Sequence, residues 1–437
     1  MKPDLFEAPD YYNLDDLLNE EHKLVRDAAR EWVKRDISPI IESYAQKAEF
    51  PKQIIQGLAE IGAFGPYIPE KYGGAGLDQI SYGLIMQEIE RGDSGVRSTA
   101  SVQSSLVMYP IWKYGNESQK QKYLPKLVSG EFMGAFGLTE PDHGSNPGGM
   151  TTNFKDMGDH YLLNGAKLWI SNAPFCNIAI VWAKNEEGRI HGLIVEREMD
   201  GFSTPETHNK WSLRASSTGE LIFQDVKVPK ENLLPNKSGL GAPLGCLDSA
   251  RYGIAWGAIG AAMDCYDTAL RYAKERVQFG KPIAGFQLQQ KKLAEMITEI
   301  TKAQFGHSLT QRVYERYFAT TKDSEFSEFL SKDWSRDDLT DTEQWRVTMF
   351  IITLLVDIFD VYEKVKKGFV DEKHLIMRMN ALKFGTMKTD LARSVWDYWK
   401  LSRDEDFIKW FESEVFDSSD TMVDKDIVSS GLKSSLR

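Results

Sequence analysis

The hydrophobic pattern of this chain changes twice, and these two changes constrain its fold more than any other feature. Residues 15–130 carry apolar side chains at helical spacing, in segments that end near Gly or Asp. From about 131 to 235 the apolar segments become short and β-like, and helical spacing returns after GLGAPLGCLDSARYG. This order predicts an α+β fold with an N-terminal helical domain (1–130), a middle antiparallel β domain (131–238) and a C-terminal helical region.

Within the middle block, the segment HYLLNGAKLWISN predicts two short strands around Asn164-Gly165, because Asn-Gly is a strong hairpin signal. The segments NIAIVWAK, EEGRI and HGLIVERE predict a strand, a turn and a second strand. ELIFQDVKVP alternates between apolar and polar residues and ends at Pro229. We therefore expect a compact, mostly antiparallel sheet.

Beyond the β block, GIAWGAIGAAMDCYDTALRYAKERVQFG predicts a helix whose Gly and Ala residues allow close approach of another element. GFQLQQKKLAEMITEITKAQ predicts a second helix, and one face of it carries Leu288, Lys292, Leu293, Met296, Ile297 and Ile300. From Phe305 the texture shifts toward charge, Trp and Phe, with few small residues, while the spacing remains helical. We therefore divide the C-terminal part into a segment 239–304 and an atypical helical region 305–437 that ends in a solvated tail.

Composition excludes several classes of partner. The net charge of −11 over 437 residues argues against nucleic acid and anionic membrane surfaces. The acidic start predicts no targeting peptide, and the apolar run VTMFIITLLVDIF is too short to span a bilayer and contains Asp357. We expect a buried helix there, no stable membrane insertion and a cytoplasmic protein. The cysteines lack metal-ligand spacing, so we expect no metal and small buried hydrophobes at Cys176, Cys246 and Cys265.

The loop FGLTEPDHGSNPGG at 136–149 is rich in glycine and carries the hydroxyls of Thr139 and Ser145. Backbone N–H groups next to glycine can point at an acceptor, so the loop could hold a ligand. The chain contains no Walker loop, no GxGxxG opening a βαβ unit, and no HExxH or GxSxG motif. On local chemistry alone, a plain connector into the β domain is the simpler interpretation.

Five motifs together give the loop a different meaning. FGLTEPDHGSNPGG, LNGAKLWISN, KWSLRASSTGEL, ARYGIAWGAIG and ERVQFGKPIAGFQLQQKKLAEM follow one another in an order and spacing that resemble the acyl-CoA dehydrogenases. IERGDSGVRSTASVQSSLVMYPIWKYG is similar to the glutaryl-CoA dehydrogenase branch of that flavoprotein family. The resemblance covers residues 12–304, about two thirds of the chain, and implies an FAD-dependent oxidoreductase.

The glutaryl branch implies a particular reaction and particular partners. Its members oxidise glutaryl-CoA at Cα–Cβ and decarboxylate it to crotonyl-CoA, a step in lysine and tryptophan degradation. Electrons leave through an electron-transfer flavoprotein, and the family assembles as a homotetramer. By resemblance we expect the same substrate, acceptor and homo-oligomer here.

The resemblance also assigns residues to the FAD. Thr139 would bond the pyrimidine edge of the flavin, and Trp169 would stack beside the ring, although plain core packing is the alternative for this indole. Ser171 stands where Thr is usual and keeps the hydroxyl. Arg276 would reach the FAD of a neighbouring subunit, where a guanidinium suits a pyrophosphate. The full set is Phe136, Leu138, Thr139, Trp169, Ser171, Arg276, Phe279 and Gln287.

For the substrate, the resemblance assigns Arg97 and Ser98, with Glu90 upstream, to the distal carboxylate of a dicarboxylic monothioester. A fixed Arg in a pocket neutralises such a carboxylate, while a structural ion pair remains the alternative for Glu90. Ser145 would lie along the pantetheine arm of coenzyme A. Positions near the thioester pocket and the adenine end are Asp248, Arg251 and Tyr252.

The resemblance breaks at the catalytic base. The glutaryl branch carries its base in a Tyr-Glu-Gly-Thr stretch near the C-terminus, behind a Gly-Gly-x-Gly loop, and neither occurs after Gln304. Other branches place the base one residue before the Arg of ARYG, which is Ala250 here. We therefore predict a chain impaired in catalysis, with no assignable catalytic residue.

The C-terminal part leaves open both the origin of the chain and its function. From about 311 onward it resembles uncharacterised bacterial helical domains, through the segment DTEQWRVTMFIITLLVDIFDVYEKVKKGFVDEKH. The chain is either a genuine fusion or two unrelated reading frames joined inside a helix, since natural fusions usually join at linkers. A non-catalytic flavin or acyl-CoA binder, or a helical interaction protein, is the rival to an enzyme.

Overall fold

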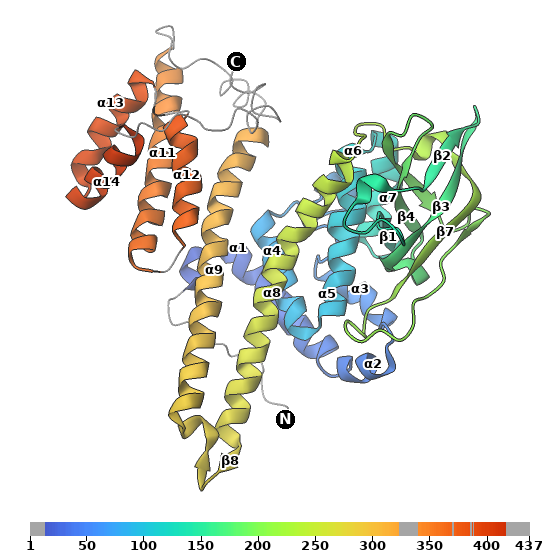
Figure 1. The fold of residues 1–437 in the computed structure, drawn as a ribbon, viewed down its shortest axis with the longest axis horizontal. Coiled ribbons are helices and arrows are strands. Elements are labelled where there is room, and N and C mark those ends of the chain that lie inside the picture. Colours follow the sequence, from blue (N-terminus) through green and yellow to red (C-terminus); the bar gives the residue numbers. More distant parts are fainter. Residues whose placement is uncertain (1–13, 323–339, 369–370, 385–386, 388, 417–437) are drawn as a thin grey trace. The chain divides into compact units, whose positions relative to one another are not determined.

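The chain folds into two compact units, Met1–Ile300 and Thr301–Arg437, which are described separately. The computed structural model (Figure 1) describes residues 14–322, 340–368, 371–384, 387 and 389–416. The predicted solvated tail lies outside these described residues.

The first unit begins with helices, as predicted. Asn19 starts α1 through a capping box, since its side chain accepts the N–H of His22 at 2.8 Å. Asp93 starts α5 by accepting the N–H groups of Gly95 and Val96. The helices are α1 (Glu20–Trp32), α2 (Ile41–Lys47), α3 (Ile55–Glu60), α4 (Gln79–Gly92), α5 (Ser94–Ser101), the π-helical η5 (Val102–Met108), α6 (Tyr109–Tyr114) and α7 (Glu117–Val128).

A curled sheet follows and lies beside α6 and α7 in Figure 1. Its order is β1-β4-β2-β3-β7-β6, with β5 paired to β4, and most pairs are antiparallel as expected. β1 and β4 run parallel, as does the single β2–β4 pair. The strands are β1 (Gly134–Gly137), β2 (Asn153–Asp156), β3 (His160–Ser171), β4 (Ile178–Lys184), β5 (Ile190–Glu196), β6 (Phe202–Ser203) and β7 (Thr218–Pro229).

Strand β4 is buried on both faces, which explains its apolar run. Ile180 and Trp182 pack into the core shared with the N-terminal helices. Val181 and Ala183 point to the opposite face and pack into a second cluster that β3 and β7 build. The sheet therefore fixes the helices on one side and its own curled strands on the other.

The predicted hairpin at Asn164-Gly165 is wrong. β3 passes through both residues as one strand paired to β7, with a register shift at this point. The Asn164 amide bonds across to Asp225 twice, at 2.9 Å, and Gly165 has a φ of +138°. A Cβ on Gly165 would lie 2.6 Å from Thr152 Oγ1. β7 pairs with β3 both before and after Asn164-Gly165. The Asn-Gly pair therefore forms a bulge within one long strand and does not form a hairpin turn.

This geometry predicts that Gly165→Ala lowers the free energy of unfolding by about 3 kcal/mol, through backbone strain and overlap with Thr152. Gly158→Ala is the matched control, because Gly158 also has a positive φ but meets nothing within 4 Å. We expect the control to cost about 1 kcal/mol. Urea denaturation of both variants measures the difference, and equal losses would contradict the bulge explanation.

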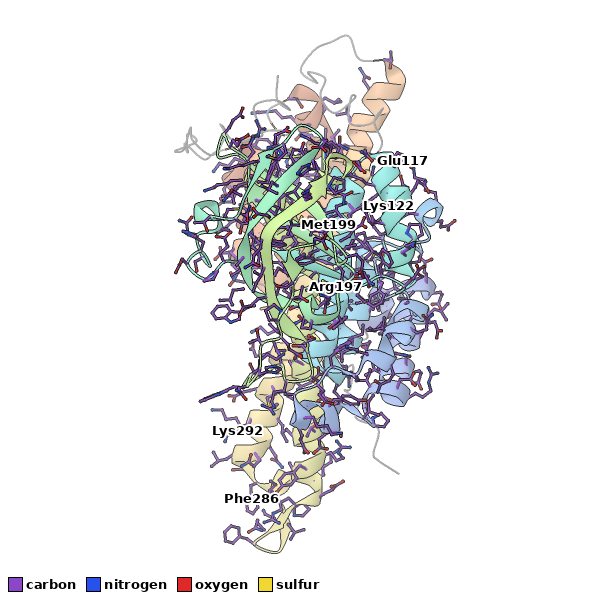
Figure 2. All side chains as sticks on the ribbon, turned by 90° about the vertical axis from the view of Figure 1, so that its right-hand side faces the viewer. Glu117, Lys122, Arg197, Met199, Phe286 and Lys292 are labelled. Atoms are coloured by element: carbon purple, nitrogen blue, oxygen red, sulfur yellow. The ribbon has the colours of Figure 1, made fainter. Side chains whose placement is uncertain are left out.

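Two long helices complete the first unit, α8 (Gly241–Glu275) and the start of α9 (Gln287–Lys322). A short hairpin, β8 (Val277–Gln278) and β9 (Lys281–Pro282), joins them, and Figure 2 shows Phe286 and Lys292 at that end, away from Arg197 and Met199 of the β domain. Their contact surface is apolar and includes Ile259, Met263, Tyr266 and Ile300.

The predicted apolar face of α9 is confirmed except at its start. Leu293, Met296 and Ile297 pack against the α8–α9 cluster that contains Ile300, whereas Leu288 is 77% exposed. The backbone of α9 continues as a helix past Gln304, where we expected the family resemblance to end. The helix is therefore continuous across Phe305, where the amino-acid composition of the sequence changes.

The second unit is a helical bundle with an aromatic core. Trp396 and Phe411 stack with ring centroids 4.1 Å apart. Asp357, in the apolar run, is buried and pairs with Arg378 at 3.0 Å, so the predicted buried helix is confirmed. Across the described residues, no helix combines the length and the apolarity needed to cross a membrane. The helices are α11 (Asp341–Lys366), α12 (Glu372–Phe384), α13 (Asp390–Trp399) and α14 (Glu405–Val415).

The cysteines follow the prediction in two of three cases. Cys176 and Cys246 are buried as small hydrophobes, and burial raises the pKa of the Cys176 thiol to about 11. Cys265 is exposed, so the expectation of a buried thiol is wrong there. Cys265 lies on the same side of α8 as the exposed Ala258, two helical turns earlier, so the thiol faces outward.

Candidate active site

A cavity of about 400 Å³ lies where the β domain meets the helices of the first unit. The end of β1, the loop after it, the end of β3, η5 and α8 each contribute to its wall. Most of the wall is apolar, and hydroxyls and one guanidinium supply its polar side chains. The residues that line it are Val102, Leu106, Phe136, Leu138, Thr139, Gly144, Ser145, Pro147, Trp169, Ile170, Ser171, Leu244, Leu247 and Arg251.

Seven residues that the sequence singled out meet in this cavity. They come from three separate motifs and from three elements, β1 with its loop, β3 and α8. The glycine-rich loop is therefore more than a connector, because it forms one wall of a cavity. The seven are Phe136, Leu138, Thr139, Ser145, Trp169, Ser171 and Arg251.

A buried ion pair fastens the loop. The ammonium of Lys167, on β3, lies 2.8 Å from Glu140 Oε1 and 3.2 Å from the carbonyl oxygen of Leu138. The Glu140 carboxylate also accepts the backbone N–H of Thr151 at 2.7 Å and of Thr152 at 3.0 Å. The Glu140 carboxylate thus connects the start of the loop to Thr151 and Thr152, just after its end, and to Lys167 of the sheet.

Protonation of the pair follows from these contacts. Burial alone would raise the pKa of Glu140, but the hydrogen bonds from Lys167, Thr151 and Thr152 outweigh burial and lower the pKa to about 2. Burial lowers the pKa of Lys167 to about 8, against the opposing effect of Glu140. Both groups are therefore charged at pH 7. The stabilisation from Glu140 is complete above the ordinary glutamate range and is lost as the pH falls toward 2.

Trp169 adopts a backbone conformation that is unusual for its residue type. Its φ is +56°, in the left-handed region, and its side chain remains 67% exposed. The register between β3 and β7 shifts between Lys167 and Ile170, so Trp169 lies on a bulge. The plain core-packing interpretation of this indole is excluded by its exposure. A strained, exposed aromatic on a cavity wall is typical of a functional position.

Of the predicted thioester-side residues on α8, Arg251 is among those that line the cavity, whereas Asp248 and Tyr252 are not. Arg251 lines the cavity and forms an ion pair with Asp248, and both side chains are exposed. Tyr252 stacks on Tyr82 with centroids 6.3 Å apart. Arg251 is therefore the cation that α8 presents to the cavity.

The predicted carboxylate-binding group lies next to α8 but not among the residues that line the cavity. Arg97, on α5, forms an ion pair with Glu90, on α4, and Ser94 also donates to that carboxylate. A Cβ on Gly257 of α8 would lie 3.0 Å from Glu90 Oε2, so the pair sits directly against α8. Ser98 lies one residue beyond Arg97 on the same helix.

The predicted intersubunit residues lie on the hairpin that joins α8 to α9. Arg276 follows α8 immediately, Phe279 is 93% exposed with a φ of +51°, and Gln287 begins α9. All three side chains are exposed in the single chain. The structure therefore separates these residues from the cavity of their own chain.

Among the described residues that line the cavity, none offers a carboxylate or an imidazole as a proton acceptor. Ala250 precedes Arg251 on α8 and is 5% exposed. Over the described part of the chain, no group of three His, Cys, Asp or Glu side chains could hold a metal ion.

Sequence reasoning missed the residues that hold the site in place. Glu140 belongs to the Thr-Glu-Pro of the polar, glycine-rich loop, whereas Lys167 is a charge inside the strand motif LNGAKLWISN. A charged residue flanked by strand residues is a signal for a buried partner. The apolar wall from η5 and α8, including Leu106 and Leu247, carried no local signal.

The fold and the site define a class of protein built from a helical, a β and a second helical domain, with a cavity where the β domain meets the helices. The family models for the acyl-CoA dehydrogenase N-terminal, middle and C-terminal domains match residues 19–131, 135–226 and 237–324. This chain belongs to the acyl-CoA dehydrogenase family.

Individual relatives give the degree of similarity. The chain is 42% identical to the probable acyl-CoA dehydrogenase YngJ of Bacillus subtilis (strain 168) over 295 residues, 65% of this chain and 77% of that protein. It is 39% identical to the glutaryl-CoA dehydrogenase of Desulfococcus multivorans over 296 residues, with 65% and 76% covered. The crystal structure of a glutaryl-CoA dehydrogenase from Mycobacterium smegmatis in complex with FADH2 superposes with a TM-score of 0.68 at 34% identity, covering 89% of this chain and 92% of that chain.

The conformation of Trp169 yields a stability prediction. Trp169→Gly should be more stable to urea than Trp169→Ala by about 1 kcal/mol, because glycine adopts a positive φ without strain. Lys155, exposed on β2, is the control, and there the alanine variant should be the more stable one. If the alanine variant is the more stable one at position 169 as well, the backbone of Trp169 is unstrained.

Proposed function

We propose that this chain binds FAD and an acyl-CoA thioester in the cavity of the first unit. The observation that carries the proposal is the meeting of Leu138, Thr139, Trp169 and Ser171 on one wall. A flat ring fits between the exposed indole and the loop, and hydroxyls and backbone N–H groups suit its polar edge. When bound, FAD supplies the acceptor for a hydride from the β carbon of the acyl group.

The remaining polar groups suit a coenzyme A ester. Ser145 lies on the loop side of the cavity, where the pantetheine arm would pass, and Arg251 lies on the α8 side. For the acyl group we propose glutaryl, because Arg97 can exchange Glu90 for the free carboxylate of a dicarboxylic monothioester. The 39% identity to a glutaryl-CoA dehydrogenase supports this choice.

We further propose a homo-oligomer, a homotetramer by family resemblance. Arg276, Phe279 and Gln287 would reach the FAD of a second copy, since they are exposed and lie apart from the cavity of their own chain. An electron-transfer flavoprotein would accept the electrons. We also propose that the chain divides into four parts, with the boundaries 1–130, 131–238, 239–304 and 305–437.

Catalysis also requires a base, and we propose that this chain lacks one. Oxidation at Cα–Cβ removes the α proton, and a positioned carboxylate usually takes it. The described cavity wall carries no carboxylate, and Ala250 fills the alternative position. The chain would hold flavin and thioester and turn over slowly.

The first test is an anaerobic titration. We expect the purified protein to carry oxidised FAD, and glutaryl-CoA to perturb its visible absorption band without bleaching it. Rapid bleaching would overturn the impairment. A protein that binds no added FAD would overturn the flavin site and favour a helical interaction protein.

The second test restores a base. Ala250→Glu should speed bleaching by glutaryl-CoA by about 10²–10⁴-fold, the range for a positioned general base. Ala258→Glu is the matched control, an exposed alanine on the same helix outside the cavity wall, and should leave the rate unchanged. Stopped-flow absorbance gives both rates. If the two variants behave alike, a missing base is not what limits this chain.

The rival function is a non-catalytic flavin or acyl-CoA binder. It predicts bound FAD and tight thioester binding in the parent protein and no gain from Ala250→Glu. The rescue experiment therefore separates an enzyme that has lost its base from a cavity that only binds.

A further inference from the structure

The Glu140–Lys167 pair supports the cavity from behind, since neither residue is among those that line it. The Lys167 side chain is 0% exposed and that of Glu140 is 2% exposed. Burying two charges is expensive, and an apolar pair of similar volume is often as stable. Stability alone therefore gives no reason for charges at this place.

The contacts of the pair lead to a single peptide bond. Lys167 Nζ donates to the carbonyl oxygen of Leu138 at 3.2 Å, and that carbonyl shares its peptide with the N–H of Thr139. The carbonyl of Thr139 in turn accepts the N–H of Leu168 at 2.9 Å. The Leu138–Thr139 peptide is thus held by β3 on both sides while Leu138 and Thr139 line the cavity.

A cation on a carbonyl oxygen changes the other end of the same peptide. It withdraws electron density from the amide, so the N–H becomes a stronger donor. In a buried setting this effect is larger than in water, because the local dielectric is low. Glu140 keeps the ammonium at this place and joins it to Thr151 and Thr152 at the far end of the loop.

We propose that Glu140 and Lys167 are positioning residues that fix and polarise the Leu138–Thr139 peptide toward the flavin. The inference rests on the proposed FAD site. A more strongly donating N–H favours the flavin state that carries more negative charge on its ring, which is the reduced one. The pair therefore raises the affinity for reduced flavin more than the affinity for oxidised flavin.

The test removes both charges together, because removing one would leave the other buried and unpaired. In the double variant Lys167→Met with Glu140→Gln, the single amide oxygen can still accept one of the two backbone N–H groups, that of Thr151 or that of Thr152. We expect about a tenfold loss of affinity for reduced FAD beyond any loss for oxidised FAD. That tenfold ratio lowers the two-electron midpoint potential by about 30 mV.

A second readout needs no flavin. Hydrogen exchange of the apo protein should become faster at amides in 138–152 in the double variant and stay unchanged in β4 and β5. This local change also shows that the variant is folded. The control is Lys230→Met with Asp156→Asn, a solvent-accessible ion pair between β2 and the residue that follows β7, and it should change neither exchange nor potential.

The outcomes separate this inference from the function beneath it. A parent protein that binds no FAD overturns the proposed function and the flavin-directed role with it. A parent that binds FAD and a folded double variant with an unchanged potential overturns the role of the pair alone. A lowered potential with faster exchange in 138–152 supports it.

Discussion

The attachment of one loop to one strand decides the geometry of the whole cavity. The loop that follows β1 has little regular structure, and its glycines offer no side-chain packing of their own. The Glu140 carboxylate compensates by accepting the backbone N–H groups of Thr151 and Thr152, just beyond the loop, and the ammonium of Lys167 on β3. This contact holds the part of the loop that brings Thr139 to the cavity wall.

Strand β3 also places Trp169 on the cavity wall, and this placement requires a strained backbone at Trp169. β3 buries Lys167 behind the loop and two residues later turns Trp169 outward with a positive φ. A β-bulge allows both, because it changes the direction of the strand between an interior and an exposed position. The strain is tolerated where the surrounding pairing with β7 fixes the strand on either side.

Sequence periodicity predicted the order of helical and β domains, since burial on a helix or a strand leaves a local pattern. It failed at Asn164-Gly165, because the choice between a hairpin and a bulge depends on β7, some 55 residues away in sequence. Local chemistry likewise favoured a connector for the loop, and only several motifs taken together pointed to a cavity. The Glu140–Lys167 pair was not predicted, because a single charged residue in a motif does not indicate which residue it pairs with.

Two carboxylates of the second unit are bound within its own helical bundle. A general base of this kind needs a pKa raised toward neutrality and a lone pair free for the substrate. Glu412 accepts Lys400 Nζ at 2.9 Å and Trp396 Nε1 at 3.0 Å, and these bonds lower its pKa. Asp357 is buried against Arg378. These two carboxylates therefore stabilise the aromatic bundle, and neither has the free lone pairs of a general base.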